Sequence, residues 1–255
     1  MKRSGYLLLI VMSCAGLTSC ATAPVKPPIP TQEVYPEVNL LISRQDVSHI
    51  VAPGETLWRL SKMYDVSIED IMRTNNLKSR TELEIGQKLS IPNAAPIRPI
   101  VPLYRSSKWK YIIIHHSATD EGSAMYFNTA HYMRGFWKGL GYHFVIDNGT
   151  KSKVDGQIEV SPRWLKQQDG SHCKAGGMNY KGIGICLVGN FSKESVSEEQ
   201  MTSLVYLVKT LMDYYNIPVK NIMGHGQVPG AKTECPGNNF PWKEFYRRLQ
   251  LKNDG

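Results

Sequence analysis

The feature that most constrains the fold of this 255-residue chain is an alternation of apolar strand-like runs with amphipathic segments, which begins at Lys108. The β-branched run 111–114 and the apolar run 182–188 are typical of buried strands. Residues 142–146 predict a further strand, because the turn-forming pair Asn148-Gly149 follows them. The second half of the chain therefore predicts an α/β domain with a central mixed sheet flanked by helices.

Two helices are expected in this region. One covers residues 127–137, and a longer one follows Ser197, which is a candidate N-cap. Apolar residues recur on one face of the longer helix, and Pro218 ends it. We expect these residues in the core rather than in a site: Met201, Leu204, Val205, Val208, Leu211, Met212 and Tyr215.

The composition supports packed hydrophobic cores and limits the classes of molecule that the chain is expected to bind. Hydrophobic residues make up 42% of the chain, and 30 Lys and Arg against 22 Asp and Glu give a net charge of +8. No basic run is dense enough to indicate nucleic acid. The mild positive excess suits an anionic envelope polymer, although a merely soluble basic surface explains it equally well.

The first residues predict export. Lys2 and Arg3 precede a short apolar stretch over 6–12, which is too short to span a bilayer. The ending Leu17-Thr18-Ser19-Cys20 resembles a bacterial lipobox, which implies a leader over 1–19, lipid on Cys20 and anchoring in the cell envelope. Residue 21 would favour the outer membrane in a diderm; ordinary cleavage near residues 21–23 is the alternative.

Two proline-rich segments divide the remainder. Residues 20–47 are predicted to form a tether and residues 93–107 a linker. They enclose a unit over 48–92 whose pattern predicts a βααβ outline, followed by the α/β domain over 108–250.

The unit over 48–92 resembles the LysM module, a binder of N-acetylglucosamine-containing glycans. The segments Gly54-Glu55-Thr56 and Asn75-Asn76-Leu77 carry this resemblance, and it implies that Gly54, Thr56 and Asn76 line a sugar groove. The helical spacing of other apolar residues makes them core candidates rather than ligand contacts: Leu57, Leu60, Tyr64 and Ile71.

Candidate metal ligands occur in two distant contexts. His115 and His116 end the run 111–114, and His225 and Cys235 lie in a loop rich in Gly and Pro. Imidazole and thiolate favour Zn²⁺, and three protein ligands with one open position are typical of a hydrolytic site. Strand alternation points His115 and His116 to opposite faces, so only one can serve, and periodicity alone does not choose between them.

Four segments, in order, resemble the zinc-dependent N-acetylmuramoyl-L-alanine amidases, a family that includes phage amidases and peptidoglycan-recognition proteins. These segments are 112–119, 141–150, 182–191 and 224–237. The resemblance implies one Zn²⁺ per chain, held by His115, His225 and Cys235. It leaves His116 to pack in the interior or to support the ligands from behind.

The resemblance also implies further roles. Tyr142 matches the family's catalytic tyrosine, and Thr233 matches the second catalytic position, which phage members fill with Lys; Lys232 is the neighbouring alternative. His172 and Asn190 match positions near the substrate cleft, and a structural role is equally open for both. Another branch of the superfamily has a catalytic Glu where Cys186 stands, so the sequence offers no carboxylate general base.

The function that follows is hydrolysis of the amide between N-acetylmuramic acid and L-alanine in peptidoglycan, by a monomer tethered to a membrane. Two alternatives remain at this point: a non-catalytic peptidoglycan-binding protein, and a zinc peptidase acting within the stem peptide. A disulfide between Cys173 and Cys186 also stays open, because an oxidising compartment permits it.

Overall fold

The computed structural model describes residues 28, 30–34, 43–135 and 138–250. The expected leader, the expected lipidation site Cys20 and most of the expected tether lie outside these residues. Within the described part, no helix combines the length and the apolar character needed to cross a membrane.

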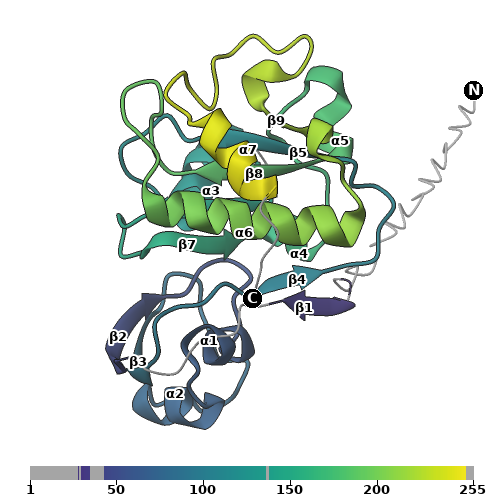
Figure 1. Ribbon diagram of the computed structural model, residues 1–255. Coiled ribbons are helices and arrows are strands. Elements are labelled where there is room, and N and C mark those ends of the chain that lie inside the picture. The colour runs from purple at the N-terminus through teal and green to yellow at the C-terminus, as the bar shows by residue number, and fades with distance from the viewer. Residues whose placement is uncertain (1–27, 29, 35–42, 136–137, 251–255) are drawn as a thin grey trace, which may run out of the picture.

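The N-terminal module has the expected βααβ outline (Figure 1). Thr56 caps the first helix by accepting a hydrogen bond from the Arg59 N–H, and Ser67 caps the second by accepting one from the Asp70 N–H. The two strands pair antiparallel, and the four apolar residues expected in the core are buried. The elements are β2 (Gln45–Ile50), α1 (Leu57–Tyr64), α2 (Ile68–Thr74) and β3 (Lys88–Ala94).

The C-terminal domain is built on a five-stranded mixed sheet in the order β7-β6-β8-β5-β9. Strands β6, β8, β5 and β9 run parallel, and β7 pairs antiparallel with β6. The mixed sheet predicted from the sequence is thereby confirmed. Its strands are β5 (Tyr111–His116), β6 (Phe144–Asn148), β7 (Asp155–Val160), β8 (Gly182–Leu187) and β9 (Ile222–Gly224).

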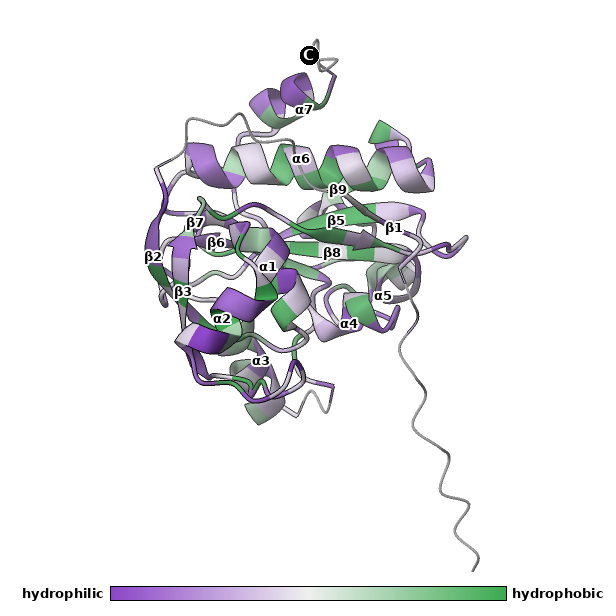
Figure 2. Cartoon of the chain, turned by 90° about the horizontal axis from the view of Figure 1, so that it is seen from below, coloured by the Kyte–Doolittle hydropathy of each residue, from purple (hydrophilic) through white to green (hydrophobic). Residues whose placement is uncertain are grey.

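Helices cover both faces of this sheet. The long helix α6 lies along one face, and α5 packs on the other (Figure 2). Ser197 caps α6 as expected, and Ser123 caps α3, so α3 begins earlier than the predicted 127–137. The helices are α3 (Ala124–Met133), α4 (Pro162–Leu165), α5 (Met178–Lys181), α6 (Glu198–Tyr215) and α7 (Trp242–Gln250), with 3₁₀ turns η1 (Ala175–Gly177), η2 (Val219–Asn221) and η3 (His225–Gln227).

Strand alternation divides β5 between two environments. Ile112 and Ile114 join the main core beneath α6, whereas Ile113 packs against Met178 and Val228 on the opposite face. His115 shares the face of Ile113, because side chains two residues apart on a strand point the same way. The alternation that fills the core therefore also places His115 on the face away from α6.

The segment predicted as a linker is packed into both halves of the molecule. Ile100 belongs to the core of the small module, and Val101 belongs to the core of the large domain. Within this segment β4 (Val101–Leu103) pairs antiparallel with β1 (Gln32–Val34). The buried Arg59 of α1 donates to the Ile100 carbonyl at 2.9 Å, so the segment is held on both sides.

Candidate metal centre

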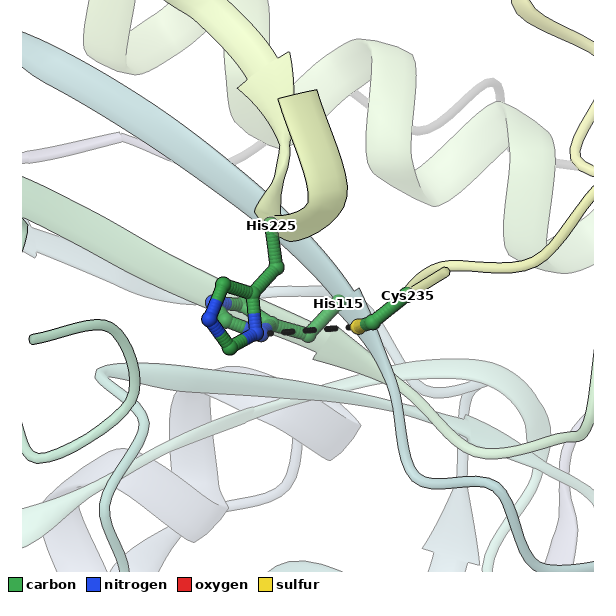
Figure 3. A group of neighbouring side chains, drawn as sticks. All are labelled: His115, His225 and Cys235. Atoms are coloured by element: carbon green, nitrogen blue, oxygen red, sulfur yellow. Dashed lines mark hydrogen bonds between the residues drawn. The ribbon is translucent and has the colours of Figure 1, made fainter. Parts of the chain in front are cut away.

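Three side chains from separate segments meet at the end of the sheet (Figure 3). His115 ends the buried part of β5, His225 opens η3 directly after β9, and Cys235 comes from the following loop. Their potential ligand atoms all lie within 4.8 Å of one another. The structure thus brings together the three residues that the sequence suggested as metal ligands.

The fold explains this convergence. Strands β5 and β9 are parallel neighbours, with Ile114 opposite Gly224, so their carboxyl ends place His115 and His225 side by side. The loop then returns, and the Gly226 N–H donates to the Cys235 carbonyl at 2.7 Å. A Cβ at Gly226 would lie 2.4 Å from the Thr233 carbonyl oxygen, so this close return requires glycine.

The donor set suits a zinc ion. The Cys235 Sγ lies 3.6 Å from His115 Nδ1 and accepts a hydrogen bond from the His116 backbone N–H at 3.4 Å. Burial raises the pKa of the Cys235 thiol to about 12, and burial followed by the neighbouring His172 lowers the pKa of His115 well below its usual value. Neutral imidazoles offer lone pairs at neutral pH, and a bound cation would hold the thiol deprotonated.

Tyr142 lies beside this cluster. Its ring centroid is 5.1 Å from that of His115 and 5.7 Å from that of His131. Burial, followed by the charges of Cys186 and Cys235, raises the pKa of the phenol well above its usual value. The Tyr142 hydroxyl therefore keeps its proton at neutral pH and remains a hydrogen-bond donor.

The two other catalytic candidates are on the returning loop. Thr233 is exposed, and its Oγ1 accepts a hydrogen bond from the Cys235 N–H at 3.2 Å. Lys232 is exposed next to it. Thr233 thus contacts the backbone of a candidate ligand, and the catalytic roles of Thr233 and Lys232 stay predictions.

The candidate substrate residues occupy different surroundings. His172 is only 8% exposed and lies behind His115, with 3.0 Å between His172 Nδ1 and His115 Nε2. Asn190 is half-buried, and its Oδ1 accepts from the Ser192 N–H. In the small module Gly54, Thr56 and Asn76 lie in exposed loops. Their assignment to substrate binding stays a prediction.

The remaining candidates have structural surroundings. His116 points to the opposite side of the strand, where its Nδ1 accepts from the Phe191 N–H at 3.2 Å. Cys173 and Cys186 are both free, so the disulfide that the sequence left open is not formed.

The sequence reasoning missed the role of glycine on β8. A Cβ at Gly184 would lie 2.5 Å from the His172 ring, and one at Gly170 would lie 2.3 Å from it. Glycine within a buried strand signals a close approach by another group. The spacing Gly182-Ile183-Gly184 carried that signal, and it marks the place where the His172 ring packs.

Comparison with known proteins assigns both modules. The N-acetylmuramoyl-L-alanine amidase family profile matches residues 105–238, and the LysM domain profile matches residues 49–92. The first match covers the sheet and the His115–His225–Cys235 cluster, and the second covers the βααβ unit.

Individual relatives are similar to parts of this chain. The endolysin of Escherichia phage T7 is 32% identical over 120 residues, which cover 45% of this chain and 69% of the endolysin. Peptidoglycan-recognition protein SC2 of Drosophila melanogaster is 30% identical over 144 residues, covering 53% of this chain and 71% of the relative. The match to the probable endopeptidase p60 of Listeria monocytogenes, 37% identical, covers 31% of this chain and only 15% of p60.

Among solved structures, the N-acetylmuramoyl-L-alanine amidase LysC from Clostridium intestinale URNW is 36% identical to this chain. The match covers 58% of this chain and 90% of LysC, with a TM-score of 0.47.

Proposed function

Because the chain belongs to the N-acetylmuramoyl-L-alanine amidase family and carries a LysM domain, we propose that it hydrolyses the amide between N-acetylmuramic acid and L-alanine at one Zn²⁺ held by His115, His225 and Cys235. The observation that carries this proposal is the convergence of those three ligand atoms within 4.8 Å. Two imidazoles and one thiolate with an open fourth position are the ligand pattern of catalytic zinc.

The residues around the cluster have defined tasks in this reaction. When bound, Zn²⁺ acts as a Lewis acid that polarises the scissile carbonyl and makes a water molecule a better nucleophile. Tyr142 keeps its proton and donates a hydrogen bond to the oxygen on which negative charge develops. The Thr233 hydroxyl holds the Cys235 backbone at the rim of the site.

The LysM domain would raise the local concentration of the enzyme on glycan strands. We further place the enzyme in the bacterial cell envelope as a monomer, anchored through lipid on Cys20, at the outer membrane if the source is a diderm. The sequence Leu17-Thr18-Ser19-Cys20 supports this anchoring. Mass spectrometry of the mature protein from membranes tests it, because a lipidated N-terminal Cys20 has a distinct mass.

The decisive test of the activity is digestion of defined muropeptides by wild type and His225→Ala, with product masses and bound zinc measured on the same samples. We expect free stem peptide beginning at L-alanine from wild type, and loss of both cleavage and zinc in the variant. A new amine terminus inside the stem peptide would instead identify a peptidase. Binding to sacculi without any cleavage would identify a non-catalytic receptor.

A further inference from the structure

We propose that His172 is a positioning residue: it fixes the tautomer and the ring plane of His115, so that Nδ1 of His115 is the atom that binds the metal. This inference rests on the zinc site of the proposed function and adds a residue that touches neither metal nor substrate. It differs from the substrate-contact role that the sequence suggested for His172.

Two consecutive hydrogen bonds connect the Gly182 carbonyl on β8 to His172 and then to His115. His172 Nε2 lies 3.2 Å from the Gly182 carbonyl oxygen, which can only accept, so the proton of the neutral ring is on Nε2. His172 Nδ1 then carries a lone pair and accepts. His115 Nε2, 3.0 Å away, must be its donor, and the lone pair of His115 is left on Nδ1.

The lone pair on His115 Nδ1 is on the side of the ring that faces Cys235. His115 Nδ1 is the ring nitrogen that lies 3.6 Å from the Cys235 Sγ (Figure 3). A ligating histidine usually donates its other N–H to a partner that fixes its orientation, and loss of such a partner typically costs 10–100-fold in metal affinity. In this chain the partner is a second imidazole, which is itself oriented by a backbone carbonyl.

The His172 ring has no freedom to turn away. Gly170 and Gly184 bracket it so closely that a Cβ at either position would lie within about 2.5 Å of a ring atom. Asn179 Oδ1 accepts from the backbone N–H groups of both His172 and Cys173 at 2.7 Å, which fixes the segment that carries the ring. The orientation of His172 is therefore set by the fold before any metal binds.

The chain contains a matched control. His143 is fully buried, and it uses its two nitrogens in the same way: Nδ1 accepts from the Gly184 N–H at 2.9 Å, and Nε2 donates to the Gln168 carbonyl at 3.1 Å. His143 is next to His172, with 5.6 Å between ring centroids, and neither of these hydrogen bonds reaches a candidate ligand. The substitution His143→Leu therefore disturbs the same part of the core and leaves the hydrogen bond between His172 and His115 in place.

The first experiment measures zinc affinity by competition with a chromophoric chelator. We expect His172→Leu to weaken zinc binding 10–100-fold, and His143→Leu to change it less than about 3-fold. His172→Asn should recover most of the loss, because the Asn oxygen can accept from His115 Nε2 in place of Nδ1. Wild-type affinity in His172→Leu, or an equal loss in His143→Leu, would overturn the proposal.

The second experiment needs no variant. Nitrogen-15 NMR of the metal-free wild type should show His115 protonated at Nε2 and unprotonated at Nδ1, with His172 protonated at Nε2. A proton on His115 Nδ1 would overturn the inference. A correct tautomer in a protein that cleaves no muropeptide would instead contradict the proposed function, so the two failures are distinguishable.

Kinetics separates positioning from direct binding of substrate. If His172 bound the substrate, His172→Leu would raise KM at saturating zinc and leave zinc affinity unchanged. We expect zinc affinity to fall instead, and activity measured at saturating zinc to recover with KM near the wild-type value.

Discussion

Three buried histidines, His115, His172 and His143, pack in a row on one face of the sheet. Ring centroids are 5.0 Å apart between His115 and His172, and 5.6 Å apart between His172 and His143. Burial is the main cause that lowers the pKa of each, and it lowers that of His172 to about 3. Lone pairs are therefore available to a metal, but the fold becomes sensitive to acid.

The sign of that sensitivity follows from proton linkage. A histidine whose pKa is depressed in the folded state binds more protons in the unfolded chain below pH 6.5, so its contribution to stability is complete above pH 6.5 and is lost as pH falls. Between pH 7 and 5 we expect wild type to lose more stability than His143→Leu, because burial holds the pKa of His143 well below its usual value in the folded state. Urea unfolding of wild type and His143→Leu at both pH values measures this; equal losses in the two proteins would contradict it.

Tyr142 provides a prediction about rate. Its protonated phenol lies beside His115, so Tyr142→Phe removes a hydrogen-bond donor to developing charge while keeping the ring. We expect kcat to fall by about 10²–10³-fold, with KM and zinc affinity unchanged. Steady-state kinetics on a defined muropeptide measures the effect, and a kcat within about 3-fold of wild type would remove Tyr142 from the chemistry.

At the scale of elements, periodicity predicted the parts whose burial follows a simple repeat. Helix α6 and strands β5 and β8 were all expected from their apolar patterns. Strands β7 and β9 were not expected. In β7 the inward positions include Gln157 and Glu159, both buried, and β9 has only three residues, so neither carries an apolar alternation.

Helix α6 stabilises the sheet from the face opposite the metal centre. Leu204 is fully buried in the main core, so Leu204→Ala should lower the free energy of unfolding by about 2–5 kcal/mol. The exposed neighbour Thr202→Ala should cost less than about 0.5 kcal/mol. Denaturant unfolding provides both values. Because His115 points the other way, zinc affinity per folded molecule should be unchanged in Leu204→Ala; a large loss would show that α6 shapes the site directly.

At the scale of the whole molecule, the two modules are in contact rather than only tethered. Gly54 of the small module is packed so closely on α4 that a Cβ there would lie 2.4 Å from a Leu165 methyl carbon. Buried charges meet nearby: Lys153 pairs with Glu159 at 2.9 Å. Burial by itself would raise the pKa of the Glu55 carboxyl. The hydrogen bond and charge of His49, followed by the charge of Lys153, outweigh this effect, so the pKa of Glu55 is lowered. The positive charge of Lys153 therefore acts on a carboxylate in each module, Glu159 in the large domain and Glu55 in the small one.

This contact predicts cooperative unfolding. Both cores share the segment 97–104, so loss of one module exposes apolar surface of the other. Differential scanning calorimetry should show one transition with equal calorimetric and van't Hoff enthalpies. Two separate transitions would mean that the modules fold independently and that residues 93–107 act as a linker, as the sequence predicted.

The sequence predicted the three candidate ligands but not the residues behind them. His115, His225 and Cys235 could be named because they stand in ordered motifs whose chemistry is recognisable. The position of His172 behind His115 depends on a contact between residues 57 positions apart, through room left by glycines, and no local pattern encodes it. Likewise, the proline content of residues 93–107 predicted a linker, whereas Ile100, Val101 and Leu103 are buried by tertiary packing.

The measurement that tests the central claim most directly is zinc K-edge X-ray absorption on the loaded wild type and on Cys235→Ser. We expect one sulfur at about 2.3 Å and two imidazole nitrogens at about 2.0–2.1 Å in wild type, and loss of the sulfur signal in the variant. Bound zinc without a sulfur ligand, or a sulfur signal that survives Cys235→Ser, would contradict the metal centre described for this amidase.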